Sequence, residues 1–473
     1  MPKTFLLTAK EIKRKIVNYE NKIVISLLFF FFVFYCYLGT LPKHGDFWGI
    51  IAPGNPFLTG SIVYYNPLVG IFFRVWIKIG SIFLPLNLNT WVMYHPGSFS
   101  EPHIIQNWCI IPFLLMLLFW VIISYVTLKN KWLTFICFGT FSFVSIIIMG
   151  QVDIWDAFWI YVAMILALKS LESEDNLKYI FSSVFALGLS MQLKPFGGLI
   201  FPVFFVFFLV VLQKKPYAQW IKYTLLFYAT LEFIFISFAA SIIWPQFTSS
   251  PSGEAIWLFN FQLTSLFQNQ GYHIILIWLF GYILILYDLW VNFQSNGKNY
   301  LNKFFIFYIF AVIAWFFITV YTLPQWWMLL VPPLLLLLDN FEQKFNYVFY
   351  VIISILFLFF TLQWGPMTSI LWFYIPVIDV TPLFVSIVVT LISAILFIWI
   401  FELRKSLFIN LNEEHLPIKY NGVLIKITPI LTAILIIFLF LFILICGQTF
   451  LPQYLGTYYP KFFFDVRPGS TYF

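Results

Sequence analysis

Residues 23–41 read IVISLLFFFFVFYCYLGTL, an apolar run without a single charged side chain. A helix that crosses the hydrocarbon core of a bilayer needs about 20 such residues. The run therefore predicts a first spanning helix, which we interpret as retained rather than cleaved as a signal peptide. The preceding segment, residues 1–22, is rich in lysine and arginine and is predicted to be a cytoplasmic basic N-terminus.

The rest of the chain has the same character. Hydrophobic residues make up 62% of the 473 residues, whereas charged residues make up only 10%. A soluble domain averages about 25% charged residues, so the composition excludes a soluble protein and predicts an all-α polytopic membrane protein. The four cysteines lie in apolar runs without metal-ligand spacing, so neither a disulfide framework nor a cysteine metal site is predicted.

Thirteen apolar segments are long enough, or nearly long enough, to be predicted as transmembrane helices. They are residues 23–41, 107–128, 132–149, 154–170, 178–193, 196–212, 220–243, 272–291, 303–322, 325–338, 346–362, 381–403 and 424–446.

A further apolar segment, residues 66–84, carries Arg74 and Lys78 in its interior. Two cations at the centre of a spanning helix are costly. We therefore predict a juxtamembrane amphipathic helix that lies on the membrane surface. It would belong to one long outer loop, residues 42–106, between the first two spans.

The distribution of basic residues predicts the orientation. With the N-terminus in the cytoplasm, 20 of the 26 lysines and arginines fall on the cytoplasmic side, as positively charged loops do in membrane proteins. The six on the outer or lumenal side are Lys43, Arg74, Lys78, Lys194, Lys461 and Arg467. The C-terminal tail, residues 447–473, is then also on the outer side. The membrane is either a plasma membrane or one of the endoplasmic reticulum type.

Acidic residues on the outer side are the first candidates for catalysis. Asp46, in HGDFWG, is a candidate general base that takes a proton from an attacking hydroxyl. It is also explained as part of an interfacial turn, because Gly-Asp pairs are common in turns. In GQVDIWD, residues 150–156, Asp153 and Asp156 are candidates to bind sugar hydroxyls or to position a metal, and Gln151 is a candidate substrate-binding residue. The two acids also suit the first turn of a helix because of its dipole.

Cations are scarce on the outer side, which makes each of them informative. Lys194, in QLKPFGG, is a candidate partner for a lipid phosphate, or an interfacial lysine that extends toward water. Arg74 and Lys78 lie four residues apart and would meet either lipid headgroups or the phosphate of a bound carrier. His273 and Gln325 are predicted to face a cavity at the same side. Glu232, in the middle of a predicted span, is a functional candidate or a buried structural residue.

Three elements of the sequence resemble the GT-C superfamily of membrane glycosyltransferases, and most closely the branch of glycosyltransferase family 87 and GPI-mannosyltransferase-I-like enzymes. The first is Asp46 followed by PGNPFLTGSIVYYNPL, residues 53–68, which contains Tyr65. The second is GQVD, and the third is ALGLSMQLKPFGGLIFP, residues 186–202. The resemblance covers residues 40–215.

This resemblance implies a GT-C-like catalytic module over residues 23–215, followed by a variable transmembrane module over 216–446. It implies a polyprenyl- or dolichyl-phosphate sugar donor, often of mannose, and a glycolipid, glycan or protein-linked acceptor. Asp46 inherits the role of general base, Lys194 that of a phosphate contact and Tyr65 that of a substrate-binding residue. Some relatives carry a DxD pair in this loop, whereas Asp46 lies between Gly45 and Phe47. No cofactor is predicted, and a divalent metal is not favoured.

Two other functions remain open from the sequence. A multi-pass lipid or solute transporter would also have many helices, broken segments and an embedded acid, although the two halves of this chain show no internal repeat. A lipid-linked oligosaccharide ligase or polymerase would share the layout but use a different donor. A nucleotide-dependent enzyme is not predicted, because no phosphate-binding glycine motif occurs.

Overall fold

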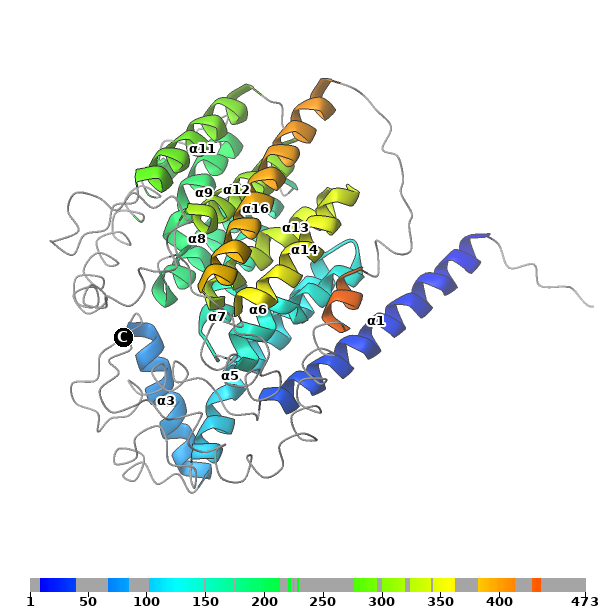
Figure 1. The fold of residues 1–473 in the computed structure, drawn as a ribbon, viewed down its shortest axis with the longest axis vertical. Helices are drawn as coiled ribbons and strands as arrows, with labels where there is room; N and C mark the ends of the chain where they lie inside the picture. The colour runs from blue at the N-terminus through cyan, green and yellow to red at the C-terminus, as the bar shows by residue number, and fades with distance from the viewer. Residues whose placement is uncertain are drawn as a thin grey trace, which may run out of the picture.

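The computed structural model describes a bundle of helices (Figure 1), and no strand occurs in the described ranges. These ranges are residues 9–39, 67–84, 102–148, 150–172, 176–194, 196–212, 220–222, 224, 228, 276–295, 300–319, 324–341, 343–361, 382–412 and 428–434.

Five of the helices are long and apolar enough to cross a membrane. They are α1 (Ala9–Gly39), α5 (Pro102–Thr127), α7 (Asp153–Glu172), α12 (Leu301–Thr319) and α16 (Pro382–Asn412). Six shorter apolar helical segments accompany them. Five of these correspond to α8 (Asn176–Leu193), α9 (Phe196–Leu212), α11 (Leu276–Ser295), α13 (Val331–Asn340) and α14 (Lys344–Thr361). These are the features of a membrane-embedded helical protein.

Eleven of the thirteen predicted spans have a helical counterpart in the structure. The other two, residues 220–243 and 424–446, lie mostly outside the described residues. Within them, residues 220–222 and 428–434 are helical.

The apolar helical segment Lys131–Ile147 corresponds to the span predicted over residues 132–149, but it is not one regular α-helix. The segment is a 3-10 helix, η2 (Lys131–Phe138), then a short α6 (Thr140–Ser142) and a π-helix, η3 (Phe143–Ile148). The break falls at Gly139, where a Cβ would lie 3.0 Å from the carbonyl oxygen of Ile136 and 3.1 Å from the Tyr350 hydroxyl. Tight packing against α14 therefore decides a local conformation that hydropathy does not encode.

Hydrogen bonds tie several helix ends together at one end of the bundle, which we call the basic end. Both Lys129 and Asn130 donate their backbone N–H to the Asp339 carboxylate, at 3.1 and 2.9 Å. The indole of Trp132 donates to Glu20 of α1 at 2.8 Å. These contacts bring the first half of α1, at Glu20, the α5–η2 turn and the last turn of α13 to the same end of the bundle.

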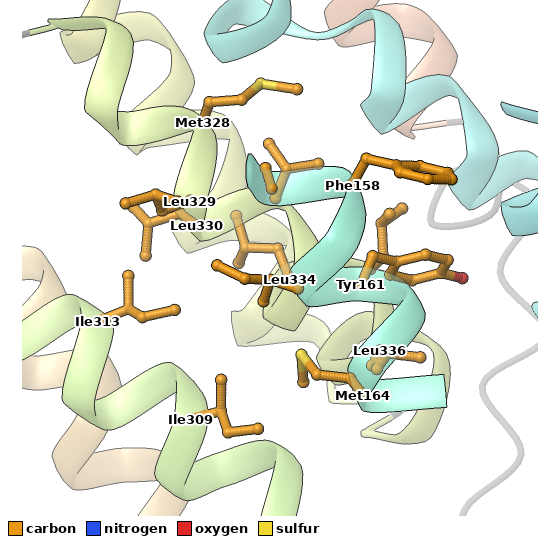
Figure 2. Close-up of a cluster of buried hydrophobic side chains, with 14 of the residues drawn as sticks. Phe158, Tyr161, Met164, Ile309, Ile313, Met328, Leu329, Leu330, Leu334 and Leu336 are labelled. Carbon is orange, nitrogen blue, oxygen red and sulfur yellow. The ribbon is translucent and has the colours of Figure 1, made fainter. Parts of the chain in front are cut away.

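The core lies around α7 and α12, which carry buried residues on most of their surface. Figure 2 shows side chains of both helices meeting those of η8 (Pro324–Leu330) and α13. The labelled residues are Phe158, Tyr161, Met164, Ile309, Ile313, Met328, Leu329, Leu330, Leu334 and Leu336. Because α7 belongs to the predicted 23–215 module and α12 to the 216–446 module, the two modules share one core.

Candidate functional site

The candidate site begins at a turn opposite the basic end. Gly150 has a φ of 58°, a left-handed conformation that glycine adopts without a steric penalty. The turn joins η3 to α7, and the backbone N–H of Gln151 closes it by donating to Ser145 O at 2.8 Å. As a result Asp153 and Asp156 both lie in the first turn of α7.

Lys194 forms a buried ion pair with the first of these acids. Its Nζ lies 2.8 Å from both Oδ1 and Oδ2 of Asp153, and the exposed fractions of the two side chains are only 10% and 0%. The same ammonium lies 6.0 Å from the ring centroid of Trp326 in η8, close enough for a cation–π interaction. The motifs GQVD and QLKP, about 40 residues apart in sequence, therefore meet in space.

The second acid contacts the same helix end. Ser190 Oγ, one turn before Lys194 in α8, donates to Asp156 Oδ1. Asp156 is fully buried, and its Oδ2 accepts no hydrogen bond from the part of the chain that the structure describes. Gly197 allows α9 to lie close to this end of α8, because a Cβ there would meet Ser190 Oγ at 2.8 Å and Met191 Cγ at 2.7 Å.

Burial gives this group its chemical character. Two carboxyl groups and one ammonium group are withdrawn from water, together with the fully buried Gln151. A buried charge is tolerated when it is paired or hydrogen-bonded. The dipole of α7 alone does not explain why Asp153 and Asp156 are buried in its first turn. Acids that only interact with a helix dipole need no partner from another segment, whereas these two contact Lys194 and Ser190. We call Gln151, Asp153, Asp156, Ser190 and Lys194 the buried polar cluster.

The helix predicted over residues 66–84 is present as α3 (Pro67–Phe83), and it packs beside the first turns of α5 (Figure 1). The indoles of Trp76 and Trp108 stack with centroids 4.7 Å apart, and each donates to the backbone carbonyl of the other, at 3.0 and 2.9 Å. Gly80 also faces Trp108, and a Cβ at this position would overlap the indole.

The structure places α3 against α5 and α8, and its predicted location on the membrane surface stays a prediction. Phe73 stacks on Phe113, which lies well within the candidate span Asn107–Thr127. The N-terminal half of α3 thus lies beside the spanning part of α5. The physical reason is that its apolar face packs on protein, including Trp155, whose ring is 4.6 Å from that of Phe72. Arg74 and Lys78 are exposed on the opposite face.

Four of the predicted site residues meet or adjoin one another, and others do not take part in the described site. Gln151, Asp153, Asp156 and Lys194 form most of the buried polar cluster, whereas Arg74 and Lys78 lie on the exposed face of α3. Gln325 is the second residue of η8, next to Trp326. The remaining predictions fall outside the described residues: Asp46, Tyr65, Glu232 and His273.

Sequence reasoning did not single out Ser190, and it did not assign Trp326 a partner. Lys194 directly follows α8, and its backbone N–H donates to Ser190 O at 3.0 Å. A polar residue four positions before Lys194 was therefore a usable signal. The contact of Trp326 with Lys194 had no signal in the sequence, because it depends on how η8 packs against α7 and α8. Among the described residues, no group of three or more His, Cys, Asp or Glu side chains is placed to hold a metal ion.

Comparison with family models, curated proteins and solved structures finds no match for this chain. The residues of the site and the three motifs are therefore what indicates a function.

Proposed function

We propose that this protein is a membrane glycosyltransferase that moves one sugar from a polyprenyl- or dolichyl-phosphate carrier to an acceptor hydroxyl on the non-cytoplasmic face. The observation that carries the proposal is the ion pair between Asp153 and Lys194. Two motifs that resemble GT-C enzymes, GQVD and QLKP, supply its two partners, which lie 2.8 Å apart and are buried.

The position of the cluster supports this assignment. It lies opposite the basic end, where the helices α7, α8 and α9 begin or end and the backbone is irregular at Gly150 and Lys194. Non-helical backbone at membrane depth is tolerated where it is buried in protein or lines a cavity. An enzyme that uses a membrane-bound donor needs polar groups at such a place.

The proposed reaction is a single displacement. The acceptor oxygen attacks the anomeric carbon while Asp46 takes the proton of the acceptor hydroxyl. The bond between that carbon and the phosphate oxygen breaks, and the lipid phosphate leaves, so the anomeric centre is inverted. Lys194 is the proposed cation for the leaving phosphate, and Asp153 holds its ammonium in a fixed position. Charges that are already oriented stabilise a developing charge better than water does.

In this proposal Asp156 and Ser190 position the sugar. A carboxylate and a hydroxyl in contact offer several acceptor sites for sugar hydroxyls. We assign the donor sugar to Asp156 and Ser190 and the phosphate to Lys194, because the Asp156 carboxylate would repel an anion.

The proposal is tested by transfer from a synthetic donor. The purified protein in nanodiscs is given a panel of polyprenyl-phosphate sugars with a radiolabelled sugar, and both released lipid phosphate and labelled acceptor are measured. The wild type should turn over at least one donor, and Asp46→Asn should reduce turnover by about 100-fold or more, as expected for loss of a general base.

The control is Asp379→Asn, in residues 363–380, a segment between two predicted spans that the predicted orientation also places on the outer side. This variant should leave turnover unchanged. Undiminished turnover in Asp46→Asn would remove Asp46 from the mechanism. Movement of intact labelled donor across the bilayer without release of lipid phosphate would instead identify a transporter. Transfer of a preassembled glycan rather than one sugar would identify a ligase or polymerase.

A further inference from the structure

Three buried hydroxyl groups lie where the segment 131–148 breaks. Thr140 directly follows the break at Gly139, and Tyr350 and Ser354 come from α14, which packs against α6. The exposed fractions of Thr140, Tyr350 and Ser354 are 0%, 1% and 1%. We call these three residues the buried hydroxyl cluster.

One row of side chains on α14 faces the break. Tyr350, Ser354 and Phe357 are separated by four and three residues, so they lie on the same side of the helix. The Tyr350 hydroxyl lies 3.1 Å from the position that a Cβ of Gly139 would take. The centroid of the Phe357 ring lies 4.8 Å from that of Phe141. Ser354, between the two contacts, is therefore opposite the break.

The hydroxyl oxygens of this cluster have no hydrogen-bond partner within the described ranges. Tyr350 and Ser354 are close to each other on successive turns of α14, but their geometry is not that of a hydrogen bond. A buried polar group without a partner is costly, and native proteins satisfy most such groups with protein atoms or with ordered water. The cluster therefore indicates a site for a small polar ligand.

The break also explains why the backbone does not satisfy these groups. A threonine in a regular helix can donate to the carbonyl four residues earlier, which for Thr140 is that of Ile136. Ile136 O already accepts the backbone N–H of Gly139 at 2.9 Å. The next free carbonyl before the break, Phe138 O, accepts the hydroxyl of Tyr35 at 2.7 Å.

The chemistry of the cluster matches water. Each hydroxyl can donate one hydrogen bond and accept two. Water has the same two capacities, and a buried water molecule typically makes about three hydrogen bonds to groups of this kind. A cation would use only the lone pairs of the hydroxyls and would leave their protons without acceptors.

We propose that the break at Gly139 is the binding site of an ordered internal water molecule, which is held by Thr140, Tyr350 and Ser354. The water completes the hydrogen bonds that the irregular segment leaves open, and it links this segment to α14. The site does not depend on the proposed sugar transfer.

Radiolytic footprinting tests for this water, because hydroxyl radicals formed from bound water oxidise the side chains next to it. The full-length protein in nanodiscs is exposed to short X-ray pulses, and the oxidation rate of each side chain is measured by mass spectrometry. The internal control is Tyr308, which is also 1% exposed but whose hydroxyl contacts Asp288 and Asn292 at 2.8 and 2.9 Å. We expect Tyr350 to be oxidised about 5-fold faster than Tyr308 or more, because only Tyr350 is next to a bound water.

Two variants assign the water to the cluster. Thr140→Val/Ser354→Ala removes two of the three proposed contacts and leaves Tyr350 as the reporter, so the oxidation rate of Tyr350 should fall to that of Tyr308. The matched control is Ser183→Ala, which removes a buried hydroxyl that donates to Ala163 O at 2.7 Å, and which should leave the rate at Tyr350 unchanged. Gel filtration of both variants should show the same profile as the parent.

Three outcomes would overturn the proposal. Equal oxidation of Tyr350 and Tyr308 in the parent protein would mean that the cluster is dry. Rapid oxidation of Tyr350 that persists in Thr140→Val/Ser354→Ala would mean that these hydroxyls do not hold the water. A rate at Tyr350 that falls when sodium chloride replaces choline chloride would identify a bound cation instead.

Discussion

The pairing of Asp153 with Lys194 is the residue-scale feature on which the candidate site depends. Removing two charges from water is costly, and their attraction offsets this cost only when the geometry is good. Here both carboxylate oxygens lie 2.8 Å from the ammonium nitrogen. The pair is therefore better explained as a means of fixing a geometry than as a source of stability.

Removing both partners of this pair should cost less stability than the two single losses added together. Lys194→Met leaves the buried Asp153 carboxylate without its ammonium, and we expect a loss of about 3 kcal/mol in the free energy of unfolding. Asp153→Asn should behave similarly. The double variant Asp153→Asn/Lys194→Met should lose less than the sum of the two, measured by unfolding in mixed detergent micelles. Strictly additive losses would contradict a direct pairing.

Gly150 permits a second residue-scale test. Because its φ is 58°, Gly150→Ala should destabilise the protein by about 1 kcal/mol, the usual cost of a left-handed conformation for a residue with a Cβ. Gly198→Ala is the matched control: its Cβ would meet only Met191 Cε, at an ordinary 3.5 Å, and alanine favours the helix in which it lies. Thermal unfolding of both variants distinguishes the two positions. Equal changes of stability in the two variants would mean that a side chain at position 150 does not strain the turn.

At the scale of elements, the structure separates segments that pack regularly from segments that are reshaped by their neighbours. α3 is a regular helix, but a pair of reciprocal hydrogen bonds between Trp76 and Trp108 determines where it lies. The segment 131–148 is apolar enough to span, yet its packing against α1, α5, α13 and α14 divides it into 3-10, α and π turns. Such turns inside a span often mark functional sites.

The docking of α3 should fail when Gly80 gains a side chain. In Gly80→Ala the new Cβ overlaps the Trp108 indole, so the two helices must separate or the stacked pair must open. We expect hydrogen exchange of the amides in 67–83 to accelerate by about 10-fold, the effect of losing about 1.4 kcal/mol of local stability. Val75→Ala, on the exposed face, serves as the control. Unchanged protection in Gly80→Ala would show that α3 is not held by this contact.

At the scale of the whole molecule, the two ends of the bundle differ in charge and in structure. The basic end joins α1, the α5–η2 turn and α13 through Glu20 and Asp339. The opposite end carries the buried polar cluster and α3. Figure 1 shows α3 and the first turns of α5 at one extremity, far from the N-terminal turns of α1.

This arrangement predicts a sidedness that labelling can measure. In intact cells a membrane-impermeant maleimide should label Lys78→Cys, on the exposed face of α3, and should leave Lys129→Cys, at the basic end, unlabelled until the membrane is permeabilised. Labelling of both positions from the same side, or a reversed pattern, would contradict the predicted orientation and with it the outer location of the site.

The sequence by itself determined the class of the molecule and the approximate bounds of most helices. A chain with 62% hydrophobic and 10% charged residues must use the bilayer as its solvent, and helix length follows from bilayer thickness. It also placed Gln151, Asp153, Asp156 and Lys194 among the candidates, because polar and charged residues near spans are costly and stand out against an apolar background.

Only the tertiary structure decided which of these residues meet. The pairing of Lys194 with Asp153, the hydrogen bond from Ser190 to Asp156 and the cation–π contact with Trp326 all join different helices. The same is true of the break at Gly139 and of the position of α3 beside α5. Hydropathy and charge report how each segment interacts with lipid and water. Contacts between helices depend instead on side-chain shape and on the closeness of approach, which no single segment specifies.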